Sequence, residues 1–162
     1  MSMRHTEILR VRKQIVAVDL ARGDSPPRAV EVFLAEQDVR QYRRQQLLDL
    51  LEHGPPFLPV RDFQEARWEI VNRDLVVWVR VPPASLAAAG EASDELFDIR
   101  QKVDVELASG TTLAGELLYS AEETLTRVTD YMNQQGRFFR LWRDEDLYFV
   151  HKPFVARVIE KN

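Results

Sequence analysis

Alternation of apolar and polar residues is strongest in the second half of the chain. The segment 102–110, KVDVELASG, places every second side chain on one apolar face, and the segment 112–119, TLAGELLY, resumes this alternation after a short turn. A period of two residues is typical of β-strands that are buried on one face. The pattern therefore predicts a half-buried β-hairpin.

The apolar period changes in the middle of each half. Between residues 39 and 51 the apolar residues recur at helical spacing, and the pattern ends at Gly54, which is followed by two prolines. A similar pattern runs from about residue 123 to Gly136. Glycine and proline commonly mark the ends of helices. We therefore predict one short amphipathic helix in each half.

Two later segments are rich in β-branched and aromatic residues. They span residues 68–81 and 147–159, and Pro153 interrupts the second one. Such composition favours strands, and a proline within a strand marks a bend or a bulge. We predict that these segments are paired closing strands, with a bend at Pro153.

The same order of segments occurs twice along the chain. Residues 15–23 match 102–110, 29–34 match 114–119, 47–60 match 128–141, and 69–79 match 148–158. The third block contains two identical pairs, Asp49 with Asp130 and Phe57 with Phe138. Four blocks in one order indicate a tandem duplication.

These patterns predict a mainly β fold with short helices (α+β), built by tandem duplication of a small strand-strand-helix-strand-strand barrel-like unit. The first repeat is expected at 1–81 and the second at 96–162, with a Pro- and Ala-rich linker at 82–95. A unit of this size is only marginally stable alone. We expect the halves to pack on one another with a pseudo-two-fold relation.

The second half resembles the Sm-like (SH3-like) small β-barrels. The residues that carry this resemblance are Val103, Val105, Leu107, Gly110, Leu113, Gly115 and Leu117. The closing sequence VHKPFVARV is similar to the last motif of the bacterial RNA-chaperone branch of that family. The resemblance implies a small barrel and an RNA contact at His151 and Lys152, and the first half is a degenerate duplicate of the pattern.

Composition narrows the functional classes. The chain has 162 residues, 22 Lys plus Arg against 26 Asp plus Glu, and no cysteine, which excludes disulfides, thiolate metal sites and cysteine nucleophiles. A net charge of -4 gives no global positive field for nucleic acid. The first fifteen residues lack the apolar core of a signal peptide, and no stretch resembles a membrane span. We expect a cytoplasmic protein that has no membrane partner.

The sequence contains no recognisable enzymatic constellation. Its histidines are His5, His53 and His151, which are not spaced as metal ligands, and the common nucleophile and phosphate-binding motifs do not occur. Asp49 and Asp130 recur at one repeat position, for which a local hydrogen bond or an ion pair with a nearby arginine is favoured over a catalytic role. We expect no catalytic residue, no metal and no cofactor.

Arginine and aromatic residues gather in the second half and are the expected partner-binding site. This site comprises Arg137, Arg140, Trp142, Arg143, His151 and Lys152. Such residues combine apolar contact area with donors for carboxylates, phosphates or bases. We expect a non-enzymatic protein-interaction or scaffold module with a protein partner, and Sm-like RNA binding is the alternative. The sequence leaves the oligomeric state open.

Overall fold

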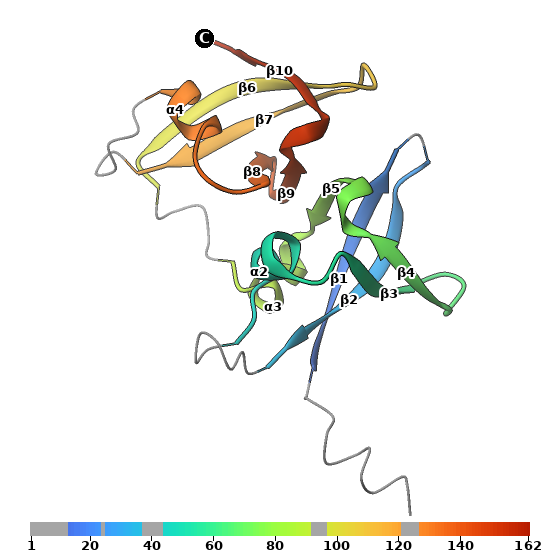
Figure 1. The fold of residues 1–162 in the computed structure, drawn as a ribbon. Coiled ribbons are helices and arrows are strands. Elements are labelled where there is room, and N and C mark those ends of the chain that lie inside the picture. The colour runs from blue at the N-terminus through green and yellow to red at the C-terminus, as the bar shows by residue number, and fades with distance from the viewer. Residues whose placement is uncertain (1–12, 24, 37–43, 92–96, 121–126) are drawn as a thin grey trace, which may run out of the picture.

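The computed structural model describes residues 13–23, 25–36, 44–91, 97–120 and 127–162. The fold is mainly β with a few short helices, as the sequence predicts. Its strands form one open, antiparallel ten-stranded sheet in the order β10-β6-β7-β8-β9-β5-β1-β2-β3-β4. Figure 1 shows the sheet as two lobes, one from each half of the chain, which meet where β9 lies beside β5.

The first half contributes five neighbouring strands. Their bounds, with those of the intervening helices, are β1 (Lys13–Arg22), β2 (Arg28–Ala35), α2 (Leu47–His53), β3 (Phe57–Asp62), β4 (Trp68–Asn72), the 3-10 turn η1 (Arg73–Leu75) and β5 (Val76–Val81). In the sheet these strands lie in the order β5-β1-β2-β3-β4. The β4 strand is therefore one edge of the whole sheet.

The second half contributes the other five strands. Its elements are β6 (Ile99–Leu107), β7 (Thr112–Tyr119), α4 (Val128–Met132), β8 (Phe138–Arg143), β9 (Asp146–His151), the 3-10 turn η4 (Lys152–Phe154) and β10 (Val155–Glu160). These strands lie in the order β10-β6-β7-β8-β9. The succession of elements and the strand order thus have the same form in both halves, and β10 is the opposite edge of the sheet.

The predicted closing strands are each divided in two. The 3-10 turn η1 separates β4 from β5, and η4 separates β9 from β10. The bend expected at Pro153 is confirmed, because that residue lies within η4. An equivalent turn without proline occurs at Arg73–Leu75, where the side chain of Asn72 accepts a hydrogen bond from the backbone of Asp74.

The helices are shorter than the sequence predicts. The α2 helix ends before Gly54 as expected, but it begins only after Gln46, and residues 39–43 of the predicted helix lie outside the described part of the chain. The α4 helix ends at Met132, well before Gly136. Gly136 has φ 118°, so it serves instead as the left-handed residue that turns the chain into β8.

The predicted linker contains ordered structure. A 3-10 turn η2 (Pro83–Ser85) leads directly into the short helix α3 (Leu86–Ala89). Ala89 is buried in the core, and Arg44 donates hydrogen bonds to the carbonyls of Ala87 and Ala88 at 2.7 and 2.8 Å. This part of 82–95 therefore packs against the first half.

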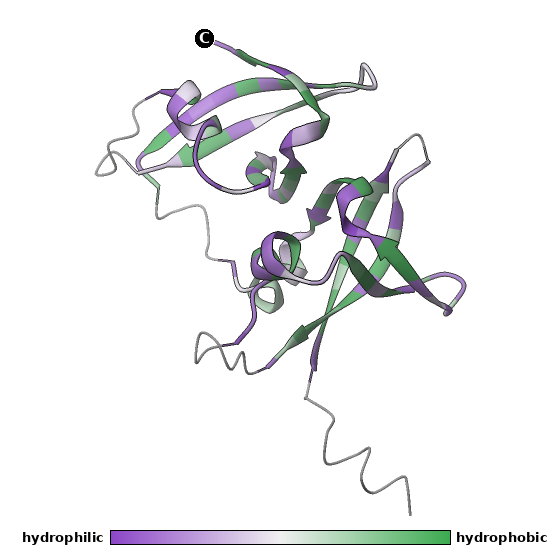
Figure 2. Ribbon diagram, viewed as in Figure 1, coloured by the Kyte–Doolittle hydropathy of each residue, from purple (hydrophilic) through white to green (hydrophobic). Residues whose placement is uncertain are grey.

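The apolar side chains form two cores. One core fills the first half and the other fills the second, and Figure 2 shows hydrophobic and hydrophilic residues alternating along the strands of both. The core of the first half also includes side chains from the second: Leu118, Phe138, Trp142, Leu147 and Phe149. Strands β8 and β9 therefore bury both faces, one inside their own half and one against the first half.

Gly115 is required where β7 and β8 approach each other. A Cβ atom at this position would lie 2.6 Å from the carbonyl oxygen of Trp142 and 2.9 Å from the side chain of Leu141. Backbone and buried leucine atoms have little freedom to move away. This close approach explains the second glycine of the apolar pattern at 103–117.

Replacing Gly115 by alanine should destabilise the fold by about 1–3 kcal/mol, the usual cost of overpacking a well-packed core. The change is measured as a lower urea midpoint for unfolding of the full chain. The control is Ala114→Ser on the exposed side of the same strand, for which we expect a change within about 0.5 kcal/mol. Equal effects of both substitutions would contradict the close-approach argument.

Candidate interaction surface

Strand β8 contains three of the six residues expected to bind a partner, Arg140, Trp142 and Arg143, and Arg137 directly precedes it. Its side chains alternate between the two cores, with Phe138 and Trp142 in the first and Phe139 and Leu141 in the second. Trp142 is 7% exposed, so it packs in the core and does not present a contact surface. A role for Trp142 as a surface anchor is therefore not supported, because both sides of its strand are covered.

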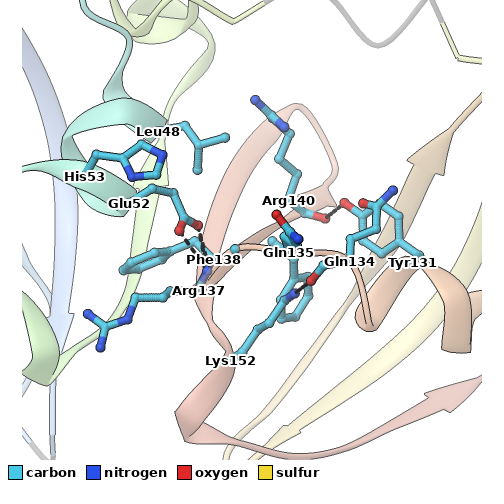
Figure 3. Close-up of a pocket in the computed structure, with 12 residues that line it drawn as sticks. Leu48, Glu52, His53, Tyr131, Gln134, Gln135, Arg137, Phe138, Arg140 and Lys152 are labelled. Atoms are coloured by element: carbon cyan, nitrogen blue, oxygen red, sulfur yellow. Dashed lines mark hydrogen bonds between the residues drawn. The ribbon is translucent and has the colours of Figure 1, made fainter.

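Three of the predicted cationic residues line one cleft of about 580 Å³ between α2 and β8 (Figure 3). They are Arg137, Arg140 and Lys152. Arg143 lies elsewhere, where its Nε donates to the carbonyl of Ala114 at 2.8 Å and its guanidinium lies 5.0 Å from the ring centre of Tyr148. The structure thus brings only half of the predicted site together.

Glu52 of the first half enters this cleft from α2. Its carboxylate accepts hydrogen bonds from the backbone N–H of Arg137 at 2.8 and 2.9 Å and of Phe138 at 2.7 Å (Figure 3). These donors belong to the start of β8, just after the left-handed turn at Gly136. The first half therefore satisfies a pair of backbone donors of the second half.

The cationic side chains of the cleft already have partners within the chain. Arg137 forms an ion pair of 2.8 Å with Asp74 of η1, and Arg140 binds Glu91 through two hydrogen bonds of 2.5 and 3.1 Å. Lys152 donates to the carbonyl of Gln134 at 2.7 Å. Asp74 precedes β5 and Glu91 follows α3. Arg137 therefore connects the second half to the first half, and Arg140 connects it to the segment 82–95 between them.

His151 is buried at the same junction. Its Nδ1 donates to the carbonyl of Val76 in β5 at 2.8 Å, and its ring stacks on Phe138 with 4.3 Å between centroids. Its Nε2 is buried and has no hydrogen-bond partner among the described residues. Burial lowers the pKa of His151 below 6.5, and the nearby charge of Arg137 acts in the same direction. His151 is therefore a neutral core residue at pH 7 rather than a surface contact.

The junction between the halves is a strand pair, β5 with β9. Trp78 pairs with Val150, Val79 with Phe149, and Val81 with Leu147 in an antiparallel register. Arg80 lies between two carboxylates, 3.4 Å from Asp19 and 3.3 Å from Asp146. The ladder makes the sheet continuous across the two halves.

The expected pseudo-two-fold relation is wrong. A two-fold axis would pair equivalent strands, whereas β5 is the last strand of its half and β9 is the fourth strand of the other. The halves are therefore joined head to tail. This relation leaves two edge strands, β4 and β10, each of which is paired on one side only.

Arg137, Arg140 and His151 thus contact the first half and the segment that follows it, and an exposed apolar surface lies elsewhere. On the β3–β4 edge the side chains of Phe57, Trp68 and Ile70 are exposed, and we call these three residues the bare edge. The sequence contained an indication of this surface, because Phe57 matches Phe138 in the alignment of 47–60 with 128–141. It was not decisive, because alternation alone does not tell which face of a strand is covered.

Side chains that could ligate a metal are dispersed among the described residues. Within them, no group of three or more His, Cys, Asp or Glu residues could hold a metal ion. Asp49 accepts a hydrogen bond from the backbone N–H of Gln46 at 2.9 Å and so caps α2, as its local interpretation predicts. In this same part of the chain, no helix has the length and apolar character needed to cross a membrane.

Comparisons with protein-family models, curated proteins and solved structures found no match for this chain.

The free energy of unfolding should decrease as the pH is lowered, because of His151. The unfolded chain takes up a proton near pH 6.5, whereas the folded state binds it only at lower pH, so stability decreases as pH falls from about 6.5 to the folded pKa. The slope reaches at most about 1.4 kcal/mol per pH unit. Urea unfolding at pH 7.5 and 5.5 measures the change.

His151→Phe should remove this part of the pH dependence, because phenylalanine retains the stack on Phe138 and does not titrate. The exposed His53 on α2 offers a matched control, and His53→Gln should leave the dependence unchanged. An unchanged slope in His151→Phe would show that another group is responsible.

Proposed function

We propose that this chain is a non-enzymatic protein-interaction module that binds its partner at the bare edge of its sheet. The observation that carries the proposal is the exposure of Phe57 on β3 and of Trp68 and Ile70 on the edge strand β4, which is paired on one side only. Exposed apolar patches on soluble domains commonly mark interaction sites. An unpaired edge strand adds backbone donors and acceptors that an extended segment of a partner can satisfy.

The bare edge is part of a larger apolar surface. Ile70 pairs with Pro59 on the neighbouring strand, and Trp68 stacks on Phe33 of β2 with 4.9 Å between ring centroids. Phe33 in turn pairs with the exposed Ile15 of β1. Apolar side chains thus extend from the edge across the outer face of the first half.

Charges beside the bare edge are neutralised within the chain. Glu69 lies between Trp68 and Ile70, and it binds Arg28 through hydrogen bonds of 2.9 and 2.5 Å. The bond from Arg28 lowers the pKa of Glu69 to about 2, and Arg67 contributes in the same direction. A partner therefore meets apolar side chains next to a fully ionised but paired carboxylate.

The favoured partner is a protein rather than RNA. Arg137 and Arg140 already bind Asp74 and Glu91, so phosphate groups would have to displace carboxylates from them. His151, which the Sm-like resemblance implies as an RNA contact, is buried. RNA binding needs cationic groups that converge on one accessible face.

The proposal includes a tandem duplication of a small Sm-like barrel unit. Its support is the matching strand order of the halves and the recurrence of a 3-10 turn between their last two strands. The turn at Arg73–Leu75 and the turn at Lys152–Phe154 lie at the same offset as the sequence match of 69–79 with 148–158. Two copies of one unit supply the two edges of the sheet.

The test is affinity capture of partners from the native host, using the full chain with Trp68→Ser and Ile70→Lys combined. We expect the double variant to lose at least nine-tenths of the specifically bound partner, because both side chains lie at the centre of the bare edge. Both residues are exposed, so unfolding midpoints should stay close to wild type.

The matched control for this experiment is Thr112→Lys, an exposed residue on the interior strand β7 of the other half. It should retain the partner. Equal capture by wild type and the double variant would contradict the proposed role of the bare edge.

A further inference from the structure

We propose that the bare edge binds strand β10 of a second copy of this chain, so that copies associate head to tail. This inference rests on the proposed function, because it names the partner of the same surface. The template is the internal junction, where the last strand of one half pairs with the fourth strand of the other. The strand β4 corresponds to β9, and β10 corresponds to β5.

Three apolar side chains of the second half are buried at the internal junction, whereas the matching side chains of the first half are exposed. Phe138, Leu147 and Phe149 are 5%, 0% and 0% exposed, and they belong to the core of the first half. Their counterparts at the repeat offsets are Phe57, Trp68 and Ile70, which are 58%, 62% and 74% exposed. These three positions of the first half are therefore also apolar, although no other part of the described chain covers their side chains.

The internal register gives the expected register between copies. Val79 pairs with Phe149 across the junction, and the counterparts of these two residues are Val158 and Ile70. Val158 packs on the core of the second half, as Val79 packs on the core of the first. Val158 of one copy should therefore lie opposite Ile70 of the next, and Glu160 opposite Trp68.

Strand β10 has backbone donors available for this pairing. The N–H of Lys161 donates to the carbonyl of Lys102 at 2.9 Å, so it points toward β6. Successive N–H groups of a strand point to opposite sides, so those of Glu160 and Val158 point to the open edge. The strand can therefore pair with β4 without breaking its ladder to β6.

The helix α4 of the second copy should also take part in the proposed contact. At the internal junction α2 lies against β8, with Leu48 and Glu52 beside Phe138. The sequence match of 47–60 with 128–141 makes α4 the counterpart of α2. The α4 helix of the second copy should then lie over Phe57.

The contact between copies should be weaker than the internal junction. Arg137 and Asp74 form an ion pair inside the chain, but their counterparts are Pro56 and Pro153, which cannot form it. Pro56 also lacks the backbone N–H with which Arg137 binds Glu52. The association is therefore mainly apolar and backbone-mediated, and it depends on concentration.

Strand β10 ends the sheet in the lobe of the second half and β4 ends it in the lobe of the first (Figure 1), and within the chain these two strands do not pair with each other. Each added copy exposes a new edge, so assembly continues beyond a dimer unless a ring closes.

Sedimentation of purified full-length chain over a wide concentration range tests the inference. Wild type should form species larger than two 18.9-kDa chains as concentration rises. Ile70→Lys should remain monomeric, because it places a charge at the centre of the contact. Glu160→Pro should also remain monomeric, since it removes an outward N–H while the inward bond of Lys161 to β6 remains.

Mixing the two variants gives the sharpest result. Ile70→Lys retains a functional β10 and Glu160→Pro retains a functional β4, so an equimolar mixture should form a heterodimer that grows no further. Glu160→Ala and Thr112→Lys are the matched controls, and both should associate like wild type. Unfolding midpoints of all variants confirm that a monomeric variant is folded.

Three outcomes would overturn the inference. They are a wild-type chain that stays monomeric throughout, a Glu160→Pro variant that still dimerises through paired β4 edges, and a mixture that forms no heterodimer. A monomeric wild type that still captures a host protein through Trp68 and Ile70 would leave the proposed function standing. A wild-type chain that self-associates through the bare edge but captures no host protein would count against the host-protein role alone.

Discussion

Pairing of β5 with β9 is the contact on which the rest of this structure depends. The strand ladder satisfies backbone groups on two edges that would otherwise be open, and it places Phe149 and Leu147 of the second half in the core of the first. Edge strands are costly to leave uncovered in a small β protein. The same ladder fixes the position of Glu52, Arg137 and His151, whose polar contacts all cross the junction.

The strands and the bend between β9 and β10 could be predicted, because alternation and proline act on the backbone locally. The alternation in 102–119 marks β6 and β7, and the bend at Pro153 is present as η4. The second helix was predicted, but its end was placed at Gly136 instead of Met132, because a glycine fits either a helix stop or a left-handed turn before a strand. The head-to-tail relation was missed for a different reason, because strand periodicity contains no information on which strands from the two halves meet.

The interaction site shows the same limit more clearly. Arginine and aromatic residues around β8 have the composition of an interface, and they do form one, but its partner is the first half of the same chain. Composition cannot distinguish an internal contact from an external one. The comparison of Phe138 with Phe57 can do so only once the structure shows which of the two is covered.

The short segment that joins β5 to β6 has a consequence for the strength of this internal contact. Val81 and Ile99 are separated by less than twenty residues, so the two faces of the β5–β9 junction meet at an effective concentration in the millimolar range. Dilution cannot separate them while the chain is intact. Cleavage within this segment would convert the junction into an ordinary bimolecular complex, whose occupancy would then depend on how much protein the cell contains.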